Sequence, residues 1–329
     1  MKKWISRLIG SADSTTQTPA DLAPTGQPAA DAQLAGIGDE IDAAYYRWLT
    51  ASAGFHATAE LEAQILALVT DFAGREHDAA ALVPRMPEVI AQLLRSLDDD
   101  AISASVLSRQ VEQDVVLVAE VIREANSAYH RTVTPVKTVE GAVMMLGQNG
   151  LRMLLARLAF RPIIKMQESG FSRRVAPQVW AQSEKCALAA SLVAPGLAAS
   201  VFEAYLAGLM QSVGLIVAFR LADRLCPDGG VPASSEFGLQ LLAAGRQLSA
   251  GIARHWEFPA EVIEAIAGIA GVADDAPSSL AQALVQGDRI AKLGLLLDAG
   301  VLPEDDSLIM DGLGSFERRC LKKMRFVES

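Results

Sequence analysis

Hydrophobic residues recur along this chain at intervals of about 3.6 positions, the spacing that places them on one face of an α-helix. The pattern is clear from Ile37 onward and continues, with short polar interruptions, to Phe326. Strict alternation of apolar and polar residues, which would indicate a half-buried β-strand, does not persist beyond about five positions. We therefore predict an all-α fold, a multi-helix bundle whose helices are joined by short loops.

Residues 121–147 show clear signals for the end of one helix and the start of another. Asn126 is expected to close the first helix, because its side chain can hydrogen-bond to local backbone. An extended segment around Pro135 follows. The next helix is expected to begin at Thr138, whose hydroxyl can accept an N-terminal N–H, and to stop at Gly147, which tolerates the left-handed conformation.

The same pattern divides the chain into five segments. A region rich in Ser, Thr, Ala and Pro lacks apolar periodicity, so we predict that it is a disordered linker. The predicted segments are 1–10, a short basic amphipathic segment; 11–36, the linker; 37–80, an N-terminal helical extension; 81–275, the main helical domain; and 276–329, C-terminal helices packed on the same bundle.

The first ten residues carry an apolar face that includes Trp4 and Leu8, beside basic residues such as Lys3. This face is too short for the apolar region of a secretory signal. We consider three roles for it: an inert tail, a protein-docking segment that uses Trp4, or a weak contact with an anionic membrane.

Composition limits the classes of function. The chain has 329 residues, of which 51% are hydrophobic, and a net charge of −10, which argues against general nucleic-acid binding. Its most apolar stretch, 206–219, is interrupted by Gln211 and Ser212, so no transmembrane segment is expected. The three cysteines are far apart and show no CxxC spacing, which favours a reducing, cytoplasmic location.

The sequence ANSAYH at 125–130, followed by the proline segment and TVEGAVMMLG at 138–147, resembles the HDOD family. HDOD domains are all-α signalling domains related to the HD metal-dependent phosphohydrolases. The resemblance runs from about Val83 to Ala273. It implies an HDOD-like bundle with an N-terminal helical extension, and it makes Asn126, Tyr129 and His130 candidate interaction residues.

The resemblance also locates the positions that hold metal ligands in catalytic HD relatives. Gln182, in VWAQS, stands where those relatives have their first metal-binding His, and Gln211-Ser212 stands in place of the His-Asp doublet. Neutral amides and hydroxyls bind divalent metals weakly. Asp288 could match the last metal-binding Asp, but as a lone carboxylate it is expected to be exposed or to cap a helix. A further His position of the family falls near Gly245. We therefore expect no metal, no cofactor and no catalytic residue.

A local group of basic residues contrasts with the acidic whole. It forms either solvated helix faces or a surface for an acidic partner. Its members are Arg152, Arg157, Arg161, Lys165, Arg173 and Arg174.

The function implied by the resemblance is a non-catalytic signal-transduction or regulatory module of bacterial type. It would bind a regulatory or signalling protein or a small ligand, and it could form a homo-oligomer. Two alternatives remain: a divergent HD-type phosphohydrolase with an atypical site, and a purely structural scaffold. The missing His-Asp doublet separates the regulatory module from the hydrolase, and a ligand-dependent change of state would separate it from the scaffold.

Overall fold

The computed structural model describes residues 27–75, 81–83, 108–109, 111–112, 115–126, 135–165, 170–226, 229–269 and 277–328. These residues form helices, apart from loops and one pairing of two short strands. The prediction of an all-α bundle is confirmed. Trp4 and the rest of the segment 1–10, Tyr129 and His130 lie outside the described residues.

The N-terminal extension contains helices α2 (Gln27–Thr50) and α3 (Ala59–Ala73), joined through strand β1 (Gly54–Phe55). Helix α2 begins ten residues earlier than predicted, so assigning all of 11–36 to a disordered linker was wrong for 27–36. The physical reason is composition: four alanines lie between Pro28 and Gly36, Ala is the best helix former, and Pro is tolerated in a first turn.

A short parallel pairing ties this extension to the main domain. Strand β1 pairs with β2 (Val231–Pro232), with Gly54 opposite Val231. Nearby, the hydroxyl of Tyr46 on α2 donates a 2.6 Å hydrogen bond to the carbonyl of Pro232. The pairing is too short to change the fold class, but it holds the segment after α2 against the segment before α12 (Ser235–His255).

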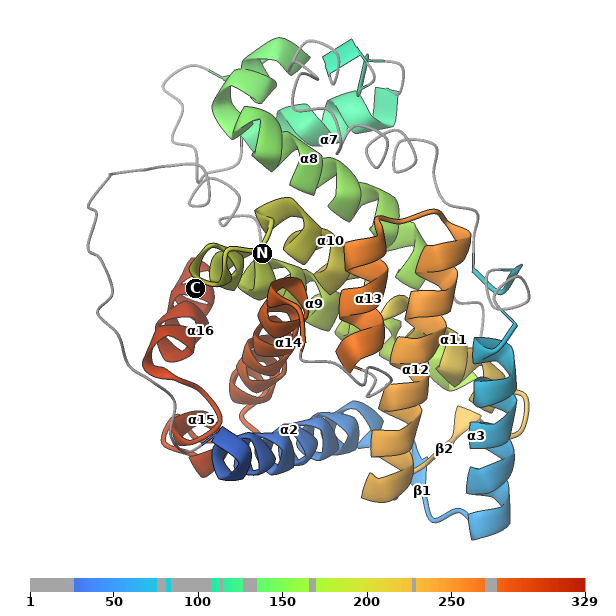
Figure 1. The fold of residues 1–329 in the computed structure, drawn as a ribbon. Coiled ribbons are helices and arrows are strands. Elements are labelled where there is room, and N and C mark those ends of the chain that lie inside the picture. Colours follow the sequence, from blue (N-terminus) through green and yellow to red (C-terminus); the bar gives the residue numbers. More distant parts are fainter. Residues whose placement is uncertain are drawn as a thin grey trace.

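The main bundle is built around α9 (Gly170–Val193) and α14 (Ser279–Asp298), which pack along each other (Figure 1). Helix α10 (Val201–Met210) packs on α9. Helix α11 (Val213–Ala222) packs on α12 (Ser235–His255), and α12 also contacts α2, α3 and α13 (Ala260–Ile269). The other described elements of this part of the chain are α8 (Val139–Lys165), the 3-10 turn η1 (Ala194–Leu197), α15 (Ser307–Met310) and α16 (Ser315–Glu328).

Helix α7 (Val115–Ala125) and the first part of α8 project from one end of this bundle, at the top of Figure 1. The local predictions for this lobe are confirmed. The backbone N–H of Gly141 donates to the Thr138 hydroxyl at 3.1 Å, and α8 is interrupted at Gly147, where φ is 70°. Glycine is favoured there because a side chain strains the left-handed conformation.

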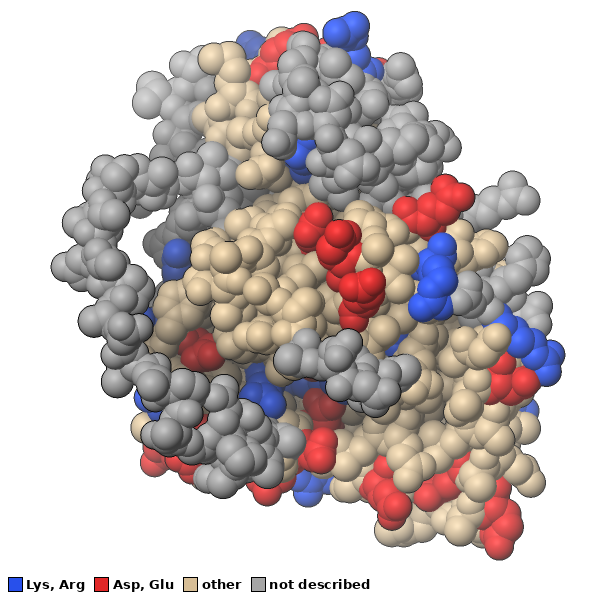
Figure 2. All heavy atoms as spheres, in the orientation of Figure 1, with Lys and Arg blue, Asp and Glu red and all other residues tan. Residues whose placement is uncertain are grey.

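The basic group predicted from the sequence does not form one surface. Arg152 and Arg157 are buried, with only 7% and 8% of each residue exposed, and the Arg157 guanidinium lies 3.9 Å from the Glu184 carboxylate. Arg161 and Arg173 are exposed. On the face drawn in Figure 2, described Lys and Arg side chains are scattered among Asp and Glu. The interpretation of this group as a surface for an acidic partner is therefore wrong for Arg152 and Arg157, which are buried.

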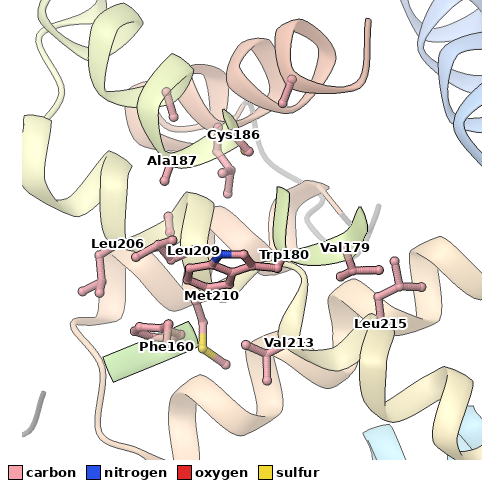
Figure 3. Packing of buried hydrophobic residues seen from close by; sticks show 14 of the residues in the cluster. Phe160, Val179, Trp180, Cys186, Ala187, Leu206, Leu209, Met210, Val213 and Leu215 are labelled. Carbon is pink, nitrogen blue, oxygen red and sulfur yellow. The ribbon is translucent and has the colours of Figure 1, made fainter. Parts of the chain in front are cut away.

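The core consists of aromatic and aliphatic side chains contributed by several helices. Figure 3 shows Trp180 of α9 among Phe160 of α8 and Leu206 and Met210 of α10. By length and composition the stretch Val201–Ala222 could cross a membrane, but 89% of its most apolar part is buried inside the protein. It forms two core helices, α10 and α11, which meet at Gln211 and Ser212.

Candidate functional site

Close backbone contacts bring the site-bearing helices together. A Cβ at Gly214 of α11 would lie 2.1 Å from the carbonyl oxygen of Gly245 on α12. A Cβ at Gly287 of α14 would lie 2.6 Å from the backbone nitrogen of Ala190 on α9. Real Cβ atoms do not approach so closely, so glycine is required at both crossings. These crossings place Asp288, the next residue of α14, directly against α9 and the turn between α10 and α11.

Gln182, Gln211 and Ser212, which the resemblance places at the metal-ligand positions of catalytic HD relatives, lie together. The Ser212 hydroxyl donates to the side-chain oxygen of Gln182 at 2.6 Å. The amide nitrogens of Gln182 and Gln211 both donate to one oxygen of Asp288, at 2.5 and 3.1 Å. The Gln211 amide also lies 2.8 Å from the sulfur of Cys186. All five side chains are buried, and their hydrogen bonds satisfy one another.

Asp288 is the residue whose environment the sequence predicted wrongly. It is only 5% exposed and caps no helix. Its second oxygen accepts hydrogen bonds from the Lys292 ammonium at 2.6 Å and from the Arg246 guanidinium at 3.1 Å. A lone carboxylate is expected at the surface because burying an unpaired charge is costly. Here two cations from α12 and α14 compensate that cost, so the carboxylate lies inside.

A second carboxylate completes the ion pairs, and it comes from the N-terminal extension. Asp42 of α2 accepts from Arg246 at 2.8 Å through one oxygen and from Lys292 at 2.5 Å through the other. We call the assembly of Gln182, Gln211, Ser212 and these four charged residues the polar centre. Its two acids and two bases give it no net formal charge, which is the condition under which buried charges are tolerated.

The ion pairs of the polar centre keep Asp42 and Arg246 ionised. Burial alone would raise the pKa of Asp42, but Arg246 and Lys292 outweigh burial and lower it to about 2. Burial favours loss of the Arg246 proton, yet Asp42 and Asp288 raise the pKa of that guanidinium. Burial, reinforced by Asp288, raises the pKa of the Cys186 thiol well above its usual value. Cys186 is therefore a thiol at neutral pH, and a thiol is a poor metal ligand.

The space left at the polar centre is small. A cavity of about 20 Å³ remains, enough for roughly one water molecule. It is lined by Tyr45, Gln182, Gln211, Ser212, Leu215, Leu242, Arg246, Asp288 and Lys292. Burial, together with Asp288 and Asp42, raises the pKa of the Tyr45 phenol, which therefore stays neutral. A cavity of this size does not admit a nucleotide or a phosphomonoester.

A comparison with protein families decides the identity of the fold. The model of the HDOD domain family matches residues 83–270, more than half of the chain. This chain belongs to the HDOD family. The matched residues nearly coincide with the segment that resembles HDOD domains by its motifs. Asp42, Asp288 and Lys292 lie outside the matched segment, so helices beyond it complete the polar centre of this HDOD protein.

Solved structures share the fold. An HDOD domain protein of unknown function from Geobacter sulfurreducens is 20% identical, with a TM-score of 0.54 over 80% of this chain and 94% of that one. A protein from Marinobacter aquaeolei VT8, provisionally named a signal transduction protein, is 20% identical, with a TM-score of 0.55 over 91% of this chain and 64% of that one. A protein from Shewanella amazonensis SB2B, provisionally named a metal-dependent phosphohydrolase, is 19% identical, with a TM-score of 0.52 over 80% of this chain and 99% of that one. These identities establish a common fold and no more.

Among curated proteins, an uncharacterized protein of Treponema pallidum (strain Nichols) is 22% identical over 217 residues. The match covers 63% of this chain and 40% of that protein. The chain therefore spans well under half of its curated relative.

The residues at the former HD metal site do not fit a metal ion. Within the described parts of the chain, no three His, Cys, Asp or Glu side chains lie close enough together to hold one. Asp288 already accepts hydrogen bonds from Arg246 and Lys292, and a divalent ion there would add positive charge beside two cations. The resemblance places a further His position of catalytic HD relatives near Gly245. In the structure Gly245 packs against Leu215, and the next residue of α12, Arg246, contributes its side chain to the site.

Asn126 occupies a second polar site, in the α7–α8 lobe. Its side-chain oxygen accepts from the backbone N–H of Val136 at 2.7 Å. Its side-chain nitrogen donates to the carbonyls of Val136 at 2.7 Å and Ile122 at 3.0 Å. The predicted hydrogen bond at the helix end is confirmed, and the same side chain also holds the segment that leads into α8. Its role as an interaction residue stays a prediction.

Sequence reasoning missed three charged members of the polar centre: Asp42, Arg246 and Lys292. Each has a weak signal in the sequence, because each charge falls beside or within an apolar helical stripe. Lys292, for example, lies between Ile290 and Leu293. Such a position indicates a buried charge only when a partner of opposite charge is known, and the partners here lie up to 250 positions away.

Proposed function

We propose that this HDOD protein is a non-catalytic regulatory module of signal transduction, which acts by binding a regulatory or signalling protein or a small ligand. One observation carries the proposal: the positions equivalent to HD metal ligands hold neutral residues, and two cations engage the remaining carboxylate. Water activation in HD enzymes needs a bound metal that lowers the pKa of water. Residues that bind a metal too weakly to hold it do not supply that step.

The family membership and one relative favour the same function. Membership of the HDOD family implies a signalling role, and the Marinobacter protein is provisionally named a signal transduction protein. The net charge of −10 suits a protein partner rather than nucleic acid. As for a signalling module of bacterial type, we propose a cytoplasmic location, and the three free thiols in the fold suit such a reducing compartment.

A divergent phosphohydrolase is the second candidate, because the Shewanella protein carries that provisional name. Such an enzyme would need room for a phosphoester beside an activated water. The cavity of about 20 Å³ is far smaller than a typical ligand pocket of roughly 300 Å³ or more. The geometry therefore favours the regulatory module over the hydrolase.

The test measures metal content and turnover on the same preparation of full-length protein. The protein is equilibrated with manganese, magnesium, iron or nickel, desalted, and analysed for bound metal by mass spectrometry. Phosphomonoesters, nucleotides and cyclic dinucleotides are then offered as substrates, with a metal-dependent HD phosphohydrolase run in parallel. We expect retention far below one ion per chain and no turnover. Stoichiometric metal together with turnover that disappears in Gln211→Ala would overturn the proposal.

A further inference from the structure

The ion pairs of Asp42 have the form of a bound ligand. Each of its two oxygens meets a different cation, Arg246 at 2.8 Å and Lys292 at 2.5 Å. Charge-assisted contacts of this kind to both oxygens are how proteins recognise carboxylates. The cations belong to α12 and α14 of the main bundle, whereas the carboxylate belongs to α2 of the N-terminal extension.

We propose that Arg246 and Lys292 form a carboxylate-binding site that Asp42 occupies as an internal ligand. A free monocarboxylate of the size of formate or acetate takes the same position when the Asp42 side chain is removed. This inference goes beyond the regulatory function and does not depend on it.

Charge balance selects the class of ligand. With Asp42 in place, two acids offset two bases; without it, Asp288 alone faces Arg246 and Lys292, and the buried centre carries one excess positive charge. Uncompensated buried charge is strongly unfavourable. One negative charge restores neutrality, so a monoanion fits. A divalent cation would increase the imbalance, and a doubly charged phosphate would reverse its sign.

The surroundings select a small, planar anion that arrives from solvent. The side chains of Asp42 and Arg246 are each 14% exposed, whereas those of Asp288 and Lys292 are 7% and 3% exposed, so solvent reaches the site beside α2. Removal of the carboxylate group of Asp42 would enlarge the adjoining cavity of about 20 Å³. The resulting space suits an acid with one or two carbons.

Tyr45 offers a further contact. Tyr45 is among the residues that line the same cavity, and its hydroxyl is buried and has no hydrogen-bond partner among the described residues. A buried hydroxyl without a partner is unusual and indicates a missing acceptor or water. Its ring lies 5.4 Å from the Lys292 nitrogen. The hydroxyl is a donor that a carboxylate oxygen of the ligand can accept.

Helix α2 is expected to stay in place when only the side chain at position 42 is shortened. Ile41 and Tyr46 on the same helix are fully buried, and the Tyr46 hydroxyl bonds to Pro232. Alanine is also the residue that favours a helix most. Asp42→Ala should therefore leave an empty carboxylate site under a docked helix.

The test is rescue of full-length Asp42→Ala by acetate and formate. Melting temperature is followed while sodium acetate or formate replaces sodium chloride at constant ionic strength. At about ten times its dissociation constant, the anion should raise the melting temperature by about 3 °C, in a saturable manner. Wild type should not respond, because Asp42 fills the site. Asp42→Asn should not respond, because its amide fills the same volume.

The double variant Asp42→Ala/Lys292→Met is the matched control for charge. It lacks one acid and one base, so its centre is neutral again and it should not respond to acetate. A response of Asp42→Ala that chloride reproduces, or that Asp42→Asn shares, would overturn the proposal, as would no response. If Asp42→Ala does not fold in chloride, its refolding yield is titrated instead: recovery in acetate supports the site, and failure to recover contradicts it.

Discussion

The polar centre and the Asn126 site both join helices through buried or half-buried polar side chains, yet they do so by different physics. The polar centre contains four charged side chains that pair with one another, and paired residues can lie as far apart in sequence as Asp42 and Lys292. The Asn126 site uses one neutral amide that joins backbone groups within about one helical turn on one side and ten residues away on the other. Charges in a shared site depend on one another, because losing one leaves the others buried and unpaired. Loss of a half-buried neutral amide leaves backbone groups that water can reach and hydrogen-bond.

The largest effect is expected at Asp288. Asp288→Ala removes the carboxylate that both Arg246 and Lys292 contact, so it should lower the free energy of unfolding by about 3–5 kcal/mol. Urea unfolding of the full chain measures this loss. Asp71→Ala is the matched control, since Asp71 also pairs with a cation four positions later, Arg75, but at the surface. It should cost less than about 1 kcal/mol. Equal losses in the two variants would show that the charges of the centre are not interdependent.

A smaller effect, dependent on pH, is expected at Asp42. Its pKa is about 2, below the usual 3.8, so the folded state binds a proton there less tightly than the unfolded state does. The ionised carboxylate therefore stabilises the fold by about 2 kcal/mol above pH ~4, and that contribution is lost as the pH falls toward 2. The difference in unfolding free energy between wild type and Asp42→Asn should shrink over this range. A difference that is constant with pH would contradict the assigned ion pairs.

The same contrast explains what the sequence could and could not predict. The helix limits at Thr138 and Gly147 and the hydrogen bond of Asn126 depend on nearby residues, and all three were predicted correctly. Gln182, Gln211 and Ser212 could be located because each belongs to a short motif with a fixed register. The environment of Asp288 depends on Arg246 and Asp42, which reach it only through the packing of α12 and α2, so no local pattern reveals that it is buried.

The start of α2 was missed for a different reason. Residues 27–36 lack apolar periodicity, so the hydrophobic pattern predicts disorder there, but intrinsic helix propensity continues the helix without it. Periodicity reports a buried face, whereas intrinsic propensity acts on every residue of a helix. A helical segment without a periodic apolar face is therefore not detected by the hydrophobic pattern.

The smallest effect is expected at Asn126. Asn126→Ala removes three hydrogen bonds to backbone groups of Ile122 and Val136, but the site is half-buried and water can replace part of them. The free energy of unfolding should fall by about 1 kcal/mol, the usual cost of a lost cap or a neutral hydrogen bond. Thr138→Ala, which removes a cap at the start of α8, should cost a similar amount and serves as the control. If the full-length chain is used to isolate a partner protein by affinity capture, binding of that protein should weaken in both variants only as far as the lobe is destabilised. Loss of binding in Asn126→Ala alone, with an unchanged melting temperature, would instead make Asn126 an interaction residue, because its contribution would then lie in the complex and not in the fold.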